Sequence, residues 1–329
     1  MAGGKFAMNS RRLLTSSPQA ILNYSSAELF EAIKMSESRT ITAVARSKGP
    51  NIVDGVTNAE LCAAFGADIV ALGIYDPNNP CFPGLPSKYR VEPDDTILEQ
   101  VQTDIGRGWT LSELRSLIGR PIASGLFGIE ENYAPGMAES FNKKVVANRK
   151  NARLLVDQGC DIIQFMDWMA SREQLKKTIR ELKDEIGDSA LLSFARPNGY
   201  GLFNEMGRKE FITENEIIDV IDAGCQIVEI PAVGTIPGFT VESVTKLVSL
   251  IHEGGALANL WIATSQEGAD TDTIKRIGFY SKMTGADILT ISDVWTTESV
   301  PNPENILALS IAVRGVRHTY RRMAFSINR

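Results

Sequence analysis

The sequence predicts one closed sheet of eight parallel strands in which every strand is followed by a helix. Three observations predict this fold class. After Arg39, apolar β-branched segments alternate with longer amphipathic ones, helix-start signals lie between them, and one short motif recurs four times. Apolar strands separated by helices are typical of a parallel sheet covered on its faces. A chain of 329 residues is long enough for one such barrel with extensions.

Eight segments are the predicted strands. In chain order they cover residues 39–47, 68–76, 120–128, 161–167, 190–196, 226–232, 257–264 and 287–293. Helices are expected between them, because four residues stand three positions before a Glu or Gln, which is the capping-box signature: Thr57, Thr110, Ser171 and Thr213. Residues 1–38 form an N-terminal helical extension, with a helix near 25–38 that should cover one end of the sheet. Residues 39–329 form the barrel domain.

The recurring motif marks the even-numbered strands. Its copies read FGADIVAL, QGCDIIQF, AGCQIVEI and TGADILTI, with glycines at Gly66, Gly159, Gly224 and Gly285. The second glycine follows the first by 93 residues, and the later steps are 65 and 61 residues. Two strand–helix units thus take about 60 residues, with an insertion of about 30 between strands 2 and 3. This even pitch favours a (βα)8 TIM barrel over an open doubly wound sheet, whose strand order reverses.

Alignment of the motif copies predicts which side chains face the barrel interior. Four and six residues after each glycine the side chains are bulky and apolar, as expected beneath helices. Five residues after it they are small or polar and should form one inward layer: Ala71, Gln164, Glu229 and Thr290. A buried carboxylate is costly unless it is paired, binds a cation or is protonated. Glu229 is therefore a candidate general base or cation ligand; the alternative is internal packing, with hydrogen bonds to Gln164 and Thr290.

The C-terminal ends of the strands supply further candidates, because active sites of such barrels lie there. The catalytic candidates, besides Glu229, are the carboxylates Asp76, Glu130, Asp167 and Asp293. Arg46 and Arg196 lie at the ends of strands 1 and 5, so two cations should stand across from these carboxylates and, with Gln164, bind an anionic substrate. This set suits acid/base chemistry or chemistry assisted by Mg²⁺.

The segment PAVGTIPGFT, residues 231–240, follows strand 6 and precedes a predicted helix. Glycines let backbone approach a ligand closely, and free N–H groups at a helix N-terminus favour anions. We predict that this loop and the next one bind an anionic group of the substrate through Gly234, Thr235, Gly238, Thr264, Ser265, Gln266 and Gly268. The alternative is an ordinary turn that ends the strand and caps the helix at Thr240.

Composition and charge exclude several classes of function. A net charge of −6 without a basic block argues against nucleic acid as a partner. No apolar run approaches the ~18 residues of a membrane span, and the N-terminus lacks signal-peptide features, so no membrane partner and a cytoplasmic location are expected. The four cysteines form no CxxC pair, as expected of a reducing compartment.

The histidines and basic residues narrow the remaining options. His252 and His318 fall in predicted helices, which leaves a Ser-His-Asp triad or a His-ligated zinc without support, so any metal should be Mg²⁺ or Mn²⁺. No nucleotide cofactor is predicted. The last helix should carry a basic stripe that is solvated or faces another subunit of a homo-oligomer, with anion binding as the alternative: Arg314, Arg317, His318, Arg321 and Arg322.

Four segments carry a family resemblance: TNAELCAAFGADIVAL, PAVGTIPGFT, TSQEGADTDTIKRIGFYSKMTGADI and PENILALSIAVRGVRHTYRRMA. They resemble an uncharacterised bacterial family of TIM-barrel proteins whose members usually carry transferred labels, "haloacid dehalogenase-like hydrolase" or "phosphoenolpyruvate phosphonomutase-like". The first label implies an aspartate nucleophile after a first Rossmann strand, which this chain lacks. The second implies an Asp-rich metal-binding turn after strand 3, where this chain has SGLFGIEEN with Glu130 and Glu131.

The combined expectation is an enzyme that acts on a small phosphorylated or carboxylated metabolite by carboxylate acid/base chemistry, as a lyase or isomerase. Two alternatives stay open. One is a non-catalytic ligand sensor on the same fold, and the other is a hydrolase that positions a water near Glu229 or Glu130.

Overall fold

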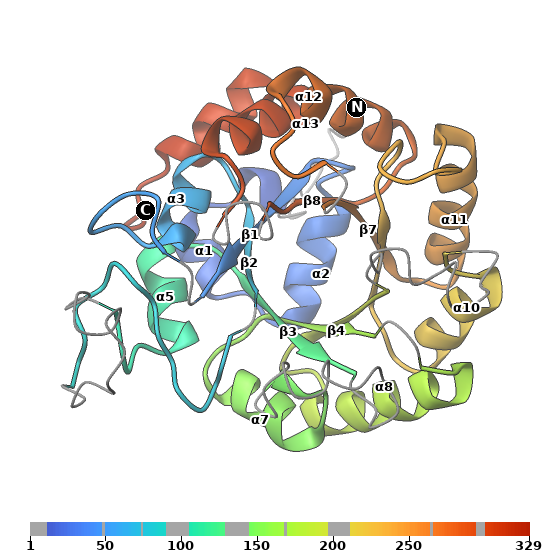
Figure 1. Ribbon diagram of the computed structural model, residues 1–329, viewed down its shortest axis with the longest axis horizontal. Helices are drawn as coiled ribbons and strands as arrows, with labels where there is room; N and C mark the ends of the chain where they lie inside the picture. Colours follow the sequence, from blue (N-terminus) through green and yellow to red (C-terminus); the bar gives the residue numbers. More distant parts are fainter. Residues whose placement is uncertain are drawn as a thin grey trace, which may run out of the picture.

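Eight parallel strands close into a barrel in the computed structural model, which describes residues 12–47, 50–73, 75–89, 105–128, 145–167, 170–196, 211–263, 266–293 and 300–329. Each strand is hydrogen-bonded to the next in chain order, and the last pairs with the first (Figure 1). The predicted TIM-barrel fold is therefore confirmed.

The strands occupy the segments that the sequence predicted, each a little shorter. They are β1 (Thr40–Arg46), β2 (Ile69–Gly73), β3 (Ile122–Phe127), β4 (Ile162–Met166), β5 (Leu191–Ala195), β6 (Ile227–Pro231), β7 (Leu257–Ile262) and β8 (Ile288–Ile291). Many of the trimmed residues are polar, glycine or proline, such as Asp68, Pro121 and Ser292.

Helices surround the barrel. They are α3 (Asn58–Ala64), α5 (Leu111–Ile118), α7 (Arg149–Asp157), α8 (Arg172–Ile186), α10 (Glu214–Asp222), α11 (Val241–Glu253), α12 (Thr271–Met283) and α13 (Pro303–Ala324). The four predicted capping boxes, at Thr57, Thr110, Ser171 and Thr213, are all formed. None of the helices in the described ranges is both long and apolar enough to cross a lipid bilayer.

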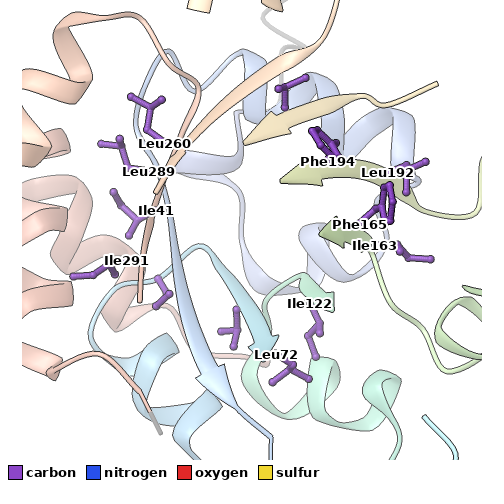
Figure 2. Close-up of a cluster of buried hydrophobic side chains, with 14 of the residues drawn as sticks. Ile41, Leu72, Ile122, Ile163, Phe165, Leu192, Phe194, Leu260, Leu289 and Ile291 are labelled. Atoms are coloured by element: carbon purple, nitrogen blue, oxygen red, sulfur yellow. The ribbon is translucent and has the colours of Figure 1, made fainter. Parts of the chain in front are cut away.

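The larger part of the core lies between the strands and these helices. Outward-facing strand residues such as Ile41, Leu72, Phe165, Phe194 and Ile291 are at most 2% exposed and pack in one cluster with the inner faces of the helices (Figure 2). These positions alternate with inward ones along each strand, as parallel strands require.

The N-terminal end of the barrel is covered by α2 (Ser26–Lys34), which follows the short helices η1 (Leu13–Thr15) and α1 (Pro18–Leu22). Figure 1 shows α2 inside the ring of strands in that view. Leu29, Ala32 and Ile33 of α2 form a second cluster with the lowest inward residues of the strands, among them four isoleucines of the recurring motif: Ile69, Ile162, Ile227 and Ile288. This confirms the expectation that the helix near residues 25–38 covers one end of the sheet.

The four motif copies repeat one contact, which we call the strand clip. A carboxylate or amide oxygen at the start of each even strand accepts the backbone N–H of the preceding odd strand at 2.8–3.3 Å. The acceptors are Asp68, Asp161, Gln226 and Asp287, and the donors are Ile41, Ile122, Leu192 and Ala258. The backbone N–H of each acceptor residue returns a bond to the carbonyl of the same partner. The clip therefore registers each pair of strands at the closed end of the barrel.

A nitrogen from a neighbouring helix contacts each clip. Arg115 of α5 donates to Asp161, Lys183 of α8 lies 3.3 Å from Gln226, and His252 of α11 lies 2.8 Å from Asp287. At Asp68 the partners come from α13, the last helix of the chain, which closes the ring beside β1. The internal repeat therefore extends beyond the strands to the helix that supports each clip.

The Asp68 clip overturns the prediction of a single basic stripe on the last helix. Arg314 and Arg322 are buried, and both form ion pairs with the Asp68 carboxylate, Arg322 at 2.7 Å. Arg317 and Arg321 stay on the surface, and Gly315 with φ 75° interrupts the helix between Arg314 and the other four basic residues. Burial raises the pKa of Asp68, but Arg314 and Arg322 outweigh it and hold that pKa below its ordinary value.

Candidate functional site

The predicted inward layer lies one step above the isoleucines, toward the C-terminal end of the barrel. Ala71 belongs to the interior cluster with α2, and Gln164, Glu229 and Thr290 are each at most 3% exposed. Glu229 and Gln164 meet directly, at 3.1 and 3.3 Å from the amide nitrogen to the two carboxylate oxygens. The inward orientation expected of Glu229 is therefore observed.

Trp261 of β7 completes the surroundings of Glu229. Its indole Nε1 donates a hydrogen bond to Oε2 of Glu229, so the carboxylate is held from β4 on one side and from β7 on the other. Asn259, two residues before Trp261, pairs in register with Glu229 and accepts a hydrogen bond of 2.8 Å from Thr290. Thr290 is therefore bonded to Asn259. The packing alternative predicted instead that Thr290 is bonded to Glu229 itself.

The electrostatic state of Glu229 follows from this environment. Burial raises the pKa of the carboxyl above its ordinary value, and side-chain hydrogen bonds from Ser193, Gln164, Trp261 and Asn259 oppose the rise without cancelling it. The donors are a hydroxyl, two amides and an indole, all of them neutral. Glu229 is thus a carboxyl group inside the barrel that takes up a proton more readily than a surface glutamate.

Trp261 and Asn259 were missing from the residues predicted by sequence. The alignment used only the motif of the even strands, and β7 is an odd strand without that motif. The available signal was the polar residue inside LANLWI, because Asn259 and Trp261 alternate with the outward-facing Ala258, Leu260 and Ile262. Extending the alternation to the odd strands would have placed both residues in the interior.

Arg46 ends β1 on the interior side of the sheet. It lies two residues past Val44, which packs in the interior cluster, and it pairs in register with Gly73 of β2. A Cβ built on Gly73 would lie 3.9 Å from Cγ of Arg46, so the arginine stem crosses this glycine. The guanidinium group is thus carried at the C-terminal end of the barrel, where a cation was expected.

The second predicted cation has a different setting. Arg196 follows β5 and is fully buried, with Nη2 at 2.8 Å from Oε1 of Glu216 on α10. Glu216 is also the acidic residue of the capping box that begins at Thr213, three positions after it. The Arg196 guanidinium therefore anchors a helix start through an ion pair.

The strand-end carboxylates Asp76, Asp167 and Asp293 are all buried at the predicted end of the barrel, and each accepts backbone N–H groups. Asp76 accepts from Asn78 at 2.9 Å and Asp167 from Ala170 at 2.6 Å, so both brace the loop that follows them. Gly128 makes room for Asp167, since a Cβ there would lie 1.8 Å from its Oδ2.

Asp293 links two loops. Its Oδ1 accepts the N–H of Gly268 at 3.2 Å and its Oδ2 the N–H of Asn302 at 3.3 Å. Burial raises the pKa of this carboxyl despite those hydrogen bonds. Gln266 lies two residues before Gly268 in the same loop, and Glu130, Glu131, Thr264 and Ser265 lie outside the described residues.

The loop after β6 is bonded internally. The N–H of Gly234 donates to the carbonyl of Phe239 at 2.8 Å, and the N–H and hydroxyl of Thr235 donate to that of Ala232 at 3.2 and 2.7 Å. Gly234 and Gly238 have φ of 76° and 85°, which suits glycine. Thr240 forms a capping box at the start of α11. The features of the turn alternative are all present, and the predicted anion-binding role of Gly234, Thr235 and Gly238 stays a prediction.

No group of three or more histidine, cysteine or acidic side chains within the described ranges is arranged to hold a metal ion. What the described part of the barrel offers is a buried carboxyl, two amides, an indole and a guanidinium: Glu229, Gln164, Asn259, Trp261 and Arg46. Such a set can hold an anionic ligand and move a proton.

A family model described as "Domain of unknown function (DUF7916)" matches residues 14–329. That description assigns neither dehalogenase nor phosphonomutase activity. No curated protein matches the chain.

Among solved structures, a methyltransferase from Methanosarcina mazei is 13% identical with a TM-score of 0.50, over 88% of this chain and 98% of that one. The carboxyl transferase domain of pyruvate carboxylase from Rhizobium etli is 13% identical with a TM-score of 0.48 over 93% of this chain, which spans about half, 51%, of that chain. A deoxyribose phosphate aldolase from Aeropyrum pernix is 14% identical with a TM-score of 0.44, over 92% and 97% of the two chains. At these identities the likeness concerns the fold alone.

Proposed function

The chain belongs to the DUF7916 family, and from its own barrel interior we propose that it is an enzyme that moves a proton on a small anionic metabolite, as a lyase or an isomerase. One observation carries the proposal. Glu229 is a buried carboxyl inside the barrel, held by the neutral donors Gln164 and Trp261, and burial raises its pKa. That environment is typical of catalytic acids and bases.

The raised pKa is what makes Glu229 suited to this role. A general base works best when its pKa lies near the working pH, because it is then both ionised and able to hold the proton it removes. Gln164 and Trp261 fix the plane of the carboxylate without a full charge, so proton uptake costs less than it would in an ion pair. Glu229 would take a proton from the substrate and return it to the product.

An internal packing role is the competing explanation, and it accounts for the same hydrogen bonds. It does not account for the charge, because a glutamine could accept from Trp261 and pair with Gln164 while avoiding the cost of burying an ionisable group. The Asp68 cluster is the counterexample within the same molecule, where a buried carboxylate faces two arginines. This contrast supports a chemical role for Glu229.

Arg46 is the proposed binding group for the anion. It stands on the interior side of β1 at the C-terminal end of the barrel, which is where substrates of this fold enter. Any metal that the reaction requires is proposed to be Mg²⁺ or Mn²⁺, since the candidate ligands at the strand ends are carboxylates and amide oxygens. A phosphonomutase-like reaction would draw them from Glu130 and Glu131, outside the described residues.

Deuterium exchange tests the proposal. A panel of small oxo acids, hydroxy acids and their phosphate esters is incubated in D2O with the protein, with and without Mg²⁺, and exchange at carbon is followed by proton NMR. At least one compound should exchange with the wild type, and Glu229→Gln should slow that exchange by about 100-fold or more. The matched control is Glu253→Gln, which removes an exposed carboxylate at the end of α11 and should exchange at the wild-type rate.

The remaining outcomes contradict the proposal. Exchange that is unchanged in a folded Glu229→Gln variant would remove this residue from the chemistry. Tight binding of a panel compound, without exchange or turnover of any compound, would indicate the ligand-sensor alternative.

A further inference from the structure

We infer that Thr290 is a positioning residue of the candidate site, which acts on Glu229 through the side-chain amide of Asn259. The inference rests on the proposed function for its chemical meaning, and it deepens that function by naming a residue that sets the charge state of the proposed base. It comes from a hydrogen-bonded chain that crosses three neighbouring strands, from β8 through β7 to β6.

The chain begins at Thr290, whose side chain is completely buried in β8. Its hydroxyl donates to Oδ1 of Asn259 at 2.8 Å. Asn259 pairs in register with Glu229, and its side chain donates a hydrogen bond to the Glu229 carboxylate. The two contacts use opposite ends of one planar amide, because Oδ1 can only accept and Nδ2 can only donate. With Oδ1 bonded to Thr290, Nδ2 is the end that serves Glu229.

The orientation of this amide matters for the ionised carboxylate. Rotation about the last side-chain bond of an asparagine exchanges its acceptor end and its donor end. With Oδ1 toward Glu229, the carboxylate would meet oxygen lone pairs instead of N–H groups, and its ionised form would be disfavoured. The Thr290 hydroxyl stabilises the other orientation, since without it Oδ1 of the buried Asn259 would lose its partner there.

The other donors to Glu229 do not need such help. The indole N–H of Trp261 can only donate, and the amide nitrogen of Gln164 lies 3.1 and 3.3 Å from the two carboxylate oxygens. The hydroxyl of Ser193 turns by rotation of its O–H alone. Loss of the Thr290 hydroxyl should therefore affect Glu229 through Asn259.

The groups around Glu229 allow this effect to be measured. The side chains that act on it from β4, β5 and β7 are uncharged: Gln164, Ser193, Asn259 and Trp261. Burial first, and Glu229 next, raise the pKa of the Cys225 thiol, so Cys225 stays neutral while Glu229 titrates. Arg46 belongs to β1, three strands along the ring from β6, and its charge is the same in every variant compared below.

NMR titration of the Glu229 carboxyl tests the inference without any substrate. The protein carries ¹³C at the glutamate side-chain carboxyls, and Glu229→Gln identifies the Glu229 signal by its loss. Thr290→Val keeps the shape of the side chain and should move the titration midpoint of Glu229 to higher pH, because the ionised form loses a donor. Thr290→Ser retains the hydroxyl and should keep the wild-type midpoint. Thr290→Ala gives the same test as Thr290→Val if the valine variant does not fold.

The matched control is Thr40→Val, the same substitution at a buried threonine of β1 whose hydroxyl has no hydrogen-bond partner within the described ranges. It should titrate as the wild type does. A double-mutant cycle tests the route: in an Asn259→Ala background, Thr290→Val should move the midpoint no further.

Three results would overturn the inference. They are a wild-type midpoint in the folded Thr290→Val and Thr290→Ala variants, an equal shift in Thr40→Val, and a shift by Thr290→Val that is as large without Asn259 as with it. Failure of the proposed function looks different, because the midpoint would then move as expected in a protein that exchanges no deuterium. Exchange that depends on Glu229, with a midpoint that Thr290→Val leaves unmoved, would contradict this inference alone.

Discussion

Asp68 and Glu229 are both buried carboxyl groups on even strands, three positions apart in the recurring motif, and their surroundings are opposite. Asp68 lies at the closed end of the barrel between Arg314 and Arg322, with a pKa below its ordinary value. Glu229 lies inside the barrel between an amide and an indole, with a pKa above its ordinary value. The first arrangement keeps a charge, and the second makes a proton easy to move.

The four motif copies show the same contrast between a structural position and a position that varies. At the clip position each of the four copies carries an acceptor for the equivalent backbone N–H of the preceding odd strand. These acceptors are Asp68, Asp161, Gln226 and Asp287. At the layer position three residues later the copies diverge into Ala71, Gln164, Glu229 and Thr290. A role that repeats with the fold belongs to the fold. A residue that departs from the repeat at a buried position points to a role of its own.

The largest expected effect is on the structural side of this comparison. Asp68→Asn should lower the free energy of unfolding by about 3–5 kcal/mol, because it leaves two buried arginines without their counter-charge. Urea unfolding measures it. The control is Asp188→Asn, which removes the charge of a side chain that is 99% exposed and should change stability very little. A loss below about 1 kcal/mol would mean that the clip is not held by charge.

The next-largest effect is on the pH dependence of stability, because the pKa of Glu229 is shifted in the direction opposite to that of Asp68. Because its folded pKa lies above the unfolded value near 4.5, the folded state holds the proton longer, and stability falls as pH rises from the unfolded pKa through the folded one. Glu229→Gln should remove this loss of stability with rising pH, because glutamine does not ionise. The melting temperature of the variant relative to the wild type should therefore be higher at pH 8 than at pH 5, by about 2 °C for each kcal/mol that ionisation costs.

Glu253→Gln, an exposed carboxylate, is the control and should show no such trend. A constant difference between Glu229→Gln and the wild type across this pH range would show that Glu229 titrates as an ordinary glutamate.

A smaller effect is expected from the indole donor. Trp261→Phe keeps an aromatic ring in the interior but removes the hydrogen bond to Glu229. A hydrogen bond to a charged acceptor is worth about 1.5–3 kcal/mol. The pKa of Glu229 should rise further, so the pH profile of deuterium exchange should move to higher pH. A profile that keeps its midpoint would exclude Trp261 as a partner of the ionised carboxylate.

The smallest effect concerns the clip at Asp287. The hydrogen bond to Asp287 raises the pKa of His252 above 6.5, so its contribution to stability is complete below pH 6.5 and is lost as pH rises through the folded pKa. The imidazole is 41% exposed, and solvent screening limits the contribution to a few tenths of a kcal/mol. His252→Gln should flatten the pH dependence of unfolding in this window by that amount. An equal slope in both proteins would contradict the assignment.

The sequence was sufficient to predict most of the fold and the centre of the candidate site. The alternation of apolar and amphipathic segments predicted all eight strands, and alignment of the motif copies predicted that Glu229 and Gln164 face inward. It was not sufficient where a contact joins distant parts of the chain. Arg314 and Arg322 meet Asp68 across 246 and 254 residues, and helical spacing on one element carries no information about such a partner. The internal bonds of the β6 loop likewise depend on its folded shape.

The Asp68 clip also leads us to expect a particular order of events in folding. The other three clips take their supporting nitrogen from a helix that precedes them in the chain, whereas Asp68 needs α13, which follows all eight strands. Until α13 docks, burying β1 and β2 would leave a carboxylate in the core without a counter-charge. Closure of the ring should therefore wait for the C-terminal helix. In refolding followed by pulsed hydrogen exchange, the amide of Ile41 should gain protection together with those of α13, after the amides of β5 to β7.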